Sequence, residues 1–584
     1  MTENKEPFTN DNEEIPKLGK EKESKNTKIC IITLLVIFVS SIIISIILTQ
    51  TIKSDEEESN KDNNSAIIKA KYQSNKENEK IILFNSNFLI NISSIKINGT
   101  ESQLSYYQYF ENLSVFEIEF KINNSLENLD EMFANCENLI EINLSLLKGI
   151  KPKSMLRTFS GCKSLTSVYL GDFDTSNIIN ISGLLKGCSS LSSIDLNHLN
   201  TSKVTDISEM FSGCTSLKSI DISNFKTSNI KYMNNLFEST PITSININSF
   251  DTSNVIDMSN LFHKCTFLTS IEISKINTKK VENMSQIFSG CQNLVSIDIS
   301  NFDTSNVFSM QGMFEYCISL KQVGLNNFET KKVEDLSYMF YSCSSLTSLD
   351  LTNFITSNLK NMAFMFSSCS SLINLSITNM DTSKVENMAN IFSYCTQLTS
   401  IDIKNFKTSN VKNFFGMFSG CQSLSEINLD NIDVSNGQDL TAMFHKCESL
   451  TSINLKNFKT SKALTLNSMF EGCSSLKKID LTEFDTSKVT DLSYMFSGCS
   501  SLDSIDLTNF KTDEVININQ MFRDCTNLIS IDMTLLNLKN VDFVFGTFDG
   551  LPSHGSISLS ENYIPKCIYD AVPENWTIIE SVLT

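Results

Sequence analysis

The sequence predicts an α/β repeat solenoid of 26-residue units, with a parallel sheet on one face, short helices on the other, a small β cap and an N-terminal transmembrane helix. Three observations lead to this fold class. Cysteines recur every 26 residues between Cys136 and Cys525 in a chain of 584 residues. The first half of each unit alternates apolar and polar residues, as a strand with one buried face does. The second half carries an apolar stripe at helical spacing.

The amino-terminal part of the chain contains the predicted membrane anchor. Ile29 to Leu48 is a run of 20 residues without a charge, which is long enough to cross about 30 Å of hydrocarbon. We expect residues 29–52 to form a transmembrane signal anchor, because the apolar run exceeds that of a cleaved signal peptide. Lysines precede the run and acidic residues follow it. This asymmetry predicts a single-pass protein of the cell membrane, with residues 1–28 as a cytoplasmic tail and an extracellular repeat domain.

Short elements are expected on both sides of the repeat array. The polar composition of residues 53–78 favours a flexible stalk. Residues 79–128 contain alternating apolar runs and the turn signal Asn98-Gly99, which predict a β N-terminal cap. A C-terminal cap is expected at residues 552–584, because an open solenoid end would expose strand edges and apolar surface.

The array is predicted to cover residues 129–551 in about 16 units, and Leu346 to Ser371 is a representative unit. Its first half has the form L-x-x-L-x-L, which gives a strand one buried face. Its second half places apolar residues at i, i+3, i+6, i+7 and i+10, which predicts one or two helical turns. The residues of this stripe are Leu359, Met362, Met365, Phe366 and Cys369. Glycines before many of the cysteines suit a left-handed stop for such a helix.

The motif of residues 346–369, L-T-S-L-D-L-T-N-F followed by T-S-N-L and M-F-S-S-C, resembles the BspA-like leucine-rich repeats of bacterial and protist surface proteins. The resemblance covers about residues 129–551. Thr240 departs from it in one cysteine position, which puts only a single unit in doubt. The resemblance implies a solenoid of the leucine-rich-repeat type and a cell-surface protein that mediates adhesion or recognition through protein binding.

The cysteine column is expected to form a buried, reduced part of the core. No C-x-x-C pair occurs, and zinc sites require ligands at such short spacings. Neighbouring units could bring two cysteines within disulfide range, but their side chains would run parallel instead of converging. Disulfides between units and metal binding are therefore the weaker alternatives.

Charge and motif content argue against nucleic-acid binding and catalysis. The net charge of −19 disfavours nucleic acid, because phosphate contacts require clustered basic residues. The four histidines, His198, His263, His445 and His554, are too far apart to form a triad or a ligand set. The sequence has no nucleophile elbow and no phosphate-binding glycine loop. We expect no enzyme activity, no cofactor and no metal site.

One exposed position of the predicted strands is acidic in many units, and we name it the acidic row. Its acidic members are Asp195, Asp221, Glu272, Asp298, Asp350, Asp402, Asp480, Asp506 and Asp532. Asparagine occupies the same position at Asn143, Asn246, Asn428 and Asn454. Like charges about 5 Å apart repel each other and require solvent or a partner. The row is the candidate partner-binding site; a solvated face, a surface for a cationic protein or a glycan, and calcium held between units all stay open.

A second ladder follows each strand, with the form Thr-Ser-Asn or Thr-Ser-Lys, as in Thr304-Ser305-Asn306. Stacked hydroxyl and amide groups are expected to satisfy backbone groups where the chain turns. The sequence as a whole predicts a surface adhesion or recognition protein that presents a concave repeat surface to a protein or glycan partner. A structural surface coat without a specific ligand is the alternative, which the mixed residues Tyr169, Gly324 and Ser376 in the row disfavour.

Overall fold

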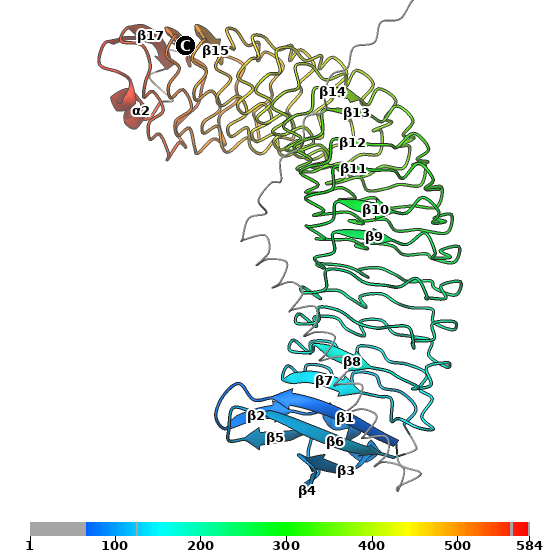
Figure 1. Ribbon diagram of the computed structural model, residues 1–584. Coiled ribbons are helices and arrows are strands. Elements are labelled where there is room, and N and C mark those ends of the chain that lie inside the picture. Colours follow the sequence, from blue (N-terminus) through cyan, green and yellow to red (C-terminus); the bar gives the residue numbers. More distant parts are fainter. Residues whose placement is uncertain (1–65, 124–125, 561–563, 582–584) are drawn as a thin grey trace, which may run out of the picture. The chain divides into compact units, whose positions relative to one another are not determined.

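The computed structural model describes residues 66–123, 126–560 and 564–581. The predicted cytoplasmic tail and signal anchor lie outside these described residues. No helix of the described part of the chain is long and apolar enough to cross a membrane. Figure 1 shows the described residues as a cap followed by rungs that stack in the order of the sequence.

An antiparallel cap precedes the array. Its elements are β1 (Ala66–Gln73), β2 (Glu79–Ile82), the 3-10 helix η1 (Ser86–Asn91), β3 (Ile92–Ile97), β4 (Thr100–Ser102), β5 (Tyr107–Phe110) and β6 (Val115–Ile122). β1 pairs with β6 on one side and with β7 (Leu139–Asn143), the first strand of the array, on the other. The sheet order is β4-β3-β6-β1-β7-β8, so the cap covers the strand edge of the first rung.

The folded cap begins earlier than the sequence analysis expected, because β1 lies in the segment predicted to be a stalk. Ala66, Ile68, Ala70 and Tyr72 alternate along β1 and are buried. Their partner residues in β6 and β7 supply the rest of that buried face, as in the pairing of Ala70 with both Ile118 and Ile142. The two intervening lysines mask this alternation in a window rich in charged residues.

The strands of the array are short and parallel. They are β7, β8 (Ser167–Tyr169), β9 (Ser244–Asn246), β10 (Ser270–Glu272), β11 (Ser296–Ile297), β12 (Gln322–Val323), β13 (Ser348–Asp350), β14 (Asn374–Ser376), β15 (Ser504–Asp506) and β16 (Ser530–Asp532). Paired strands lie one repeat apart in register, as Leu349 of β13 with Leu375 of β14.

The predicted parallel sheet is divided into separate groups of strands. No strand is present between β14 and β15, whereas a second ladder of single bridges runs without a break from Ser154 to Phe543 on another side of the rungs. Asparagine side chains also connect neighbouring rungs, including those without strand pairing. Asn405 Nδ2 donates to the carbonyl of Thr378 at 2.8 Å, and Asn431 Nδ2 donates to that of Lys404 at 2.6 Å.

The expected short helices are wrong, because residues 362–368 form consecutive turns. Phe364 and Ser368 adopt left-handed φ values of 59° and 62°, which interrupt helical hydrogen bonding. Their N–H groups donate instead to carbonyls of the next rung, at 2.8 Å from Phe364 to Ala389 and 2.7 Å from Ser368 to Ser393. The turns recur every three to four residues, so they bury the same stripe that a helix would.

The interior of the array consists of stacked identical side chains. Phe340 and Phe366 stack at 6.1 Å between ring centroids with planes 4° apart, and similar pairs repeat along the rungs. Cys369 is fully buried, and its Sγ donates to the carbonyl of Phe340 at 3.1 Å. The described cysteines are all free, and those from Cys136 to Cys525 are buried. The reduced core column predicted from the spacing is therefore present in this structure.

The chain after the array adds β17 (Gly555–Ser560), α2 (Lys566–Ala571) and β18 (Trp576–Ser581). β17 pairs in parallel with β16, and β18 pairs in parallel with β17. Trp576 is buried against this end, and its Nε1 donates to the carbonyl of Pro552 at 2.9 Å. α2 is the only α-helix among the described residues.

Candidate functional site

The acidic row lies on the outward side of the strand positions, one member per rung. Glu272, Asp350, Asp506 and Asp532 belong to strands β10, β13, β15 and β16. The remaining members, Asp195, Asp221, Asp298, Asp402 and Asp480, occupy the same position in rungs where no strand extends over it. Asp532 is half-buried and the other eight are exposed. The structure thus places all nine side chains on one face of the stacked rungs.

Each aspartate of the row closes a local turn with one carboxylate oxygen. Oδ1 of Asp350 accepts from the backbone N–H of Thr352 at 2.9 Å and from its hydroxyl at 2.7 Å. Asp480 accepts from Thr482 in the same way, at 3.0 and 2.8 Å. The backbone and hydroxyl donors lower the pKa of both carboxyl groups, because they stabilise the ionised form. These bonds to Oδ1 leave Oδ2 of an exposed side chain available to solvent or a partner.

The asparagine members close the same turn without a charge. Asn143 Oδ1 accepts from the N–H and hydroxyl of Ser145 at 2.9 and 2.7 Å, and Asn428 Oδ1 accepts from the N–H of Asp430 at 2.9 Å. An amide oxygen is therefore sufficient for the fold at this position. The negative charge of the aspartates adds a property that the turn does not require.

The charge of the row is largely uncompensated. Asp402 is the only row member with an ion pair among the described residues, between its Oδ2 and Lys404 Nζ at 3.1 Å. Asp506 and Asp532 face each other directly across β15 and β16, and Asp480 precedes them by one rung. Three carboxylates in consecutive rungs therefore form the most concentrated negative charge of the row.

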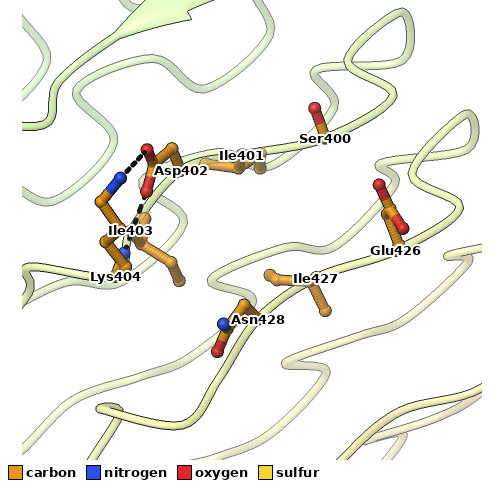
Figure 2. A pocket seen from close by; sticks show the side chains of 8 residues that line it. All are labelled: Ser400, Ile401, Asp402, Ile403, Lys404, Glu426, Ile427 and Asn428. Carbon is orange, nitrogen blue, oxygen red and sulfur yellow. Dashed lines mark hydrogen bonds and ion pairs between the residues drawn. The ribbon is translucent and has the colours of Figure 1, made fainter.

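A shallow cavity of about 410 Å³ opens on the row between two rungs that lack strand pairing (Figure 2). Its lining residues are Ser400, Ile401, Asp402, Ile403, Lys404, Glu426, Ile427 and Asn428. Ile401 and Ile403 are buried and Ile427 is half-buried, so the cavity combines an apolar base with the charged groups of Asp402, Lys404 and Glu426. This combination suits an amphipathic side chain from a partner.

The cysteines and threonines that the sequence also singles out lie in positions that stabilise the fold, and two of the histidines are half-buried. The described residues contain no group of three or more His, Cys, Asp or Glu side chains that could hold a metal ion. The threonine ladder predicted to be structural bonds the rungs together: Thr304 Oγ1 donates to the carbonyl of Glu329 at 3.0 Å and accepts from its N–H at 2.7 Å. His263 and His445 lie seven rungs apart in equivalent positions, and burial lowers the pKa of both.

Sequence reasoning missed two features of this face. One is the turn-closing role of the row, whose signal is the recurring spacing Asp-x-Ser or Asp-x-Thr, as in Asp350 to Thr352. The other is the asparagine ladder that follows the row, in which Asn379, Asn405 and Asn431 each donate to a carbonyl of the preceding rung at 2.6 to 2.8 Å. Its signal is an asparagine at one fixed position of many units.

Comparison with known proteins identifies a family for most of the array. The family model described as "Mycoplasma protein of unknown function, DUF285" matches residues 153–272, 256–375, 345–453 and 438–555. No curated protein matches the chain.

The solved structures that are similar to the chain include the following three. The first is a leucine-rich repeat protein from Eubacterium ventriosum, with 16% identity, a TM-score of 0.26, and coverage of 67% of this chain and 83% of that one. The second is the TLR13–ssRNA13 complex, with 14% identity, a TM-score of 0.17, and coverage of 77% and 86%. The third is the mouse RP105/MD-1 complex, with 13% identity, a TM-score of 0.16, and coverage of 73% and 85%.

Proposed function

We propose that this chain, which belongs to the DUF285 family, is a recognition protein that binds a basic protein partner through the acidic row. One observation carries the proposal: eight aspartates of the row keep a negative charge in a turn that asparagine closes in other rungs, at Asn143 and Asn428. Uncompensated carboxylates repel one another, and a cationic partner relieves that repulsion on binding. The resemblance of the repeat to BspA-like surface repeats supports an adhesive role at the cell surface.

The proposed setting is a membrane-anchored extracellular protein. The charge-free run within residues 29–52 supports the anchor, and the lysines before it support a cytoplasmic amino terminus. The repeat array would then lie outside the cytoplasm, available to a partner. Protease treatment of intact cells tests this arrangement, since it should remove the repeat domain; an intact, protected chain would contradict the extracellular placement.

The site is tested by removing charge without removing the turn. The triple variant Asp480→Asn, Asp506→Asn, Asp532→Asn keeps an acceptor oxygen in each turn, as Asn143 and Asn428 do naturally. We expect it to fold normally and to bind basic proteins more weakly. The measurement is equilibrium binding of the full-length chain to a panel of purified proteins of high isoelectric point.

A matched control removes the same number of charges from a different side of the rungs. Glu282, Glu334 and Glu386 are exposed and lie beside the bridge ladder, and each can be changed to Gln. The control triple should bind like the native chain. Equal weakening in both triples would indicate a general charge effect, and no weakening in either would leave the row as a solvated face and favour a coat without a specific ligand.

A further inference from the structure

We propose that the array has a second binding surface, on the side formed by the consecutive turns, and that this surface binds an uncharged glycan. The surface is the aromatic patch of Tyr316, Tyr338, Tyr341 and Phe364, which come from three consecutive rungs. It lies on a different side of the rungs from the acidic row and does not depend on the function proposed for that row.

The four rings of the aromatic patch contact one another at the surface. Tyr338 and Phe364 stack at 4.8 Å between centroids with planes 6° apart. Tyr341 lies at the centre, with its ring close to perpendicular to Tyr316, Tyr338 and Phe364 at 5.1, 5.6 and 6.1 Å. Tyr316 has 45% of its surface exposed and the other three rings are half-buried. The patch therefore offers ring surface and three phenol hydroxyls in one place.

The backbone at these residues determines which substitutions the fold accepts. Tyr316, Tyr338 and Phe364 have φ values of 56°, 59° and 59°, a left-handed conformation that is unfavourable for bulky side chains. Glycine occupies the same two positions in several other rungs, as at Gly312 and Gly420. The same left-handed conformation recurs at these positions along the array with other side chains, such as Arg157, Glu209 and Lys264, so it belongs to the fold. What distinguishes the patch is that neighbouring rungs carry aromatic rings there.

The surroundings of the patch determine the kind of ligand. The turn segments 310–316, 336–342 and 362–368 contain one charged residue, Glu315. Its Oε2 already accepts from Gln286 Nε2 at 3.0 Å and from Ser289 Oγ at 3.3 Å. A neutral surface of aromatic rings bordered by hydroxyl, amide and carboxylate groups matches a sugar, whose C–H groups contact ring faces while its hydroxyls form hydrogen bonds.

The test compares two tyrosines in equivalent positions. Tyr338 belongs to the patch, whereas Tyr494 has the same φ of 59° in a rung outside it and accepts from Gln520 Nε2 at 2.9 Å. Each can be changed to Gly, which suits the left-handed backbone and occurs naturally at this position, as at Gly312. Should Tyr338→Gly fail to fold, Tyr316→Gly is the second variant, since glycine also recurs at its position.

The measurement is binding of the full-length chain and its variants to an array of immobilised neutral and acidic oligosaccharides. We expect binding to neutral oligosaccharides, a loss of about tenfold in affinity for Tyr338→Gly and no loss for Tyr494→Gly. We also expect little change with salt, in contrast to binding at the acidic row. The inference is overturned if no neutral oligosaccharide binds, if acidic ones alone bind, if both variants lose binding equally, or if the patch residues affect only a protein ligand.

Discussion

Replacement of Thr330 by Val should reduce the protection of one backbone amide, the N–H of Ile355. Thr330 is fully buried, and its hydroxyl donates to the carbonyl of Ile355 at 3.1 Å and accepts from the N–H of the same residue at 2.8 Å. Valine keeps the shape and removes both bonds. An intramolecular hydrogen bond contributes about 0.5 to 1.5 kcal/mol, and valine removes two of them, so we expect a loss of about 1 to 2 kcal/mol in the free energy that protects this amide.

The array itself contains a natural example of the change. Val434 occupies the position equivalent to Thr330, and the N–H of Lys459, which would otherwise bond to the missing hydroxyl, donates to the carbonyl of Asn457 at 3.0 Å. The expected loss is therefore smaller where the following turn can rearrange in this way. Thr330→Ser is the matched control, because it keeps the hydroxyl and loses only a methyl group.

Hydrogen exchange read by mass spectrometry measures the effect directly. In Thr330→Val the amide of Ile355 should exchange roughly 5 to 30 times faster than in the native chain, whereas Thr330→Ser should retain most of its protection. Native protection of Ile355 in the valine variant would refute the reasoning, since it would show that the hydroxyl ladder does not bond the rungs together.

Three further predictions concern the backbone, the core thiols and the row. In a urea titration, Gly420→Ala should destabilise the array by about 1 to 2 kcal/mol. The φ of Gly420 is 73°, and the added Cβ would lie 2.8 Å from the ring of Tyr394. Gly324→Ala is the control and should be neutral, because no heavy atom lies within 4 Å of its added Cβ. Cys369, whose pKa burial raises to about 12, should react with thiol reagents only after denaturation, as mass spectrometry of labelled peptides will show. The pKa of Asp350 is lowered by the N–H and hydroxyl of the residue two positions later, so the stability it contributes is present above the unfolded pKa of about 3.9 and is lost as pH falls through the lower folded value. The difference in unfolding free energy between the native chain and Asp350→Asn should therefore change as pH falls below 4, and a difference that is independent of pH would contradict this.

The repeat period and the core positions could be predicted from the sequence because each unit places the same side chain at the same depth. Spacing alone predicts that Phe366 and Cys369 belong to the core, and both are fully buried. The threonine ladder was likewise predicted to be structural. These features depend only on which residues recur, and recurrence is visible in one chain.

The conformation of the second half of each unit could not be predicted in the same way. A stripe such as Met362, Met365, Phe366 and Cys369 is compatible with a helix and with consecutive turns, because both bury residues every three to four positions. The choice depends on whether backbone N–H groups bond within the rung or to the next one. Left-handed residues such as Phe364 make that choice, and nothing in an aromatic side chain signals a positive φ.

The sequence predicts the candidate site as a row of charges. It does not predict the turns that the aspartates close or the cavity between two unpaired rungs. Periodicity placed Asp350 and Asp480 on one exposed face, which the structure bears out for position only. The cavity beside Asp402 lies between two rungs without strand pairing, and the repeat pattern does not indicate which rungs pair. The aromatic patch is also a product of stacking, because rings from neighbouring rungs are 22 to 26 residues apart in the sequence.

The central claim is that the acidic row is the surface that meets a basic partner. A zero-length carboxylate–amine cross-linker applied to the complex, followed by mass spectrometry, tests it most directly. We expect cross-links from Asp480, Asp506 and Asp532 to lysines of the partner. These should be lost at high salt, because the Debye length falls from about 10 Å at 0.1 M to about 3 Å at 1 M. Cross-links confined to Glu334 and Glu386, beside the bridge ladder, would contradict it.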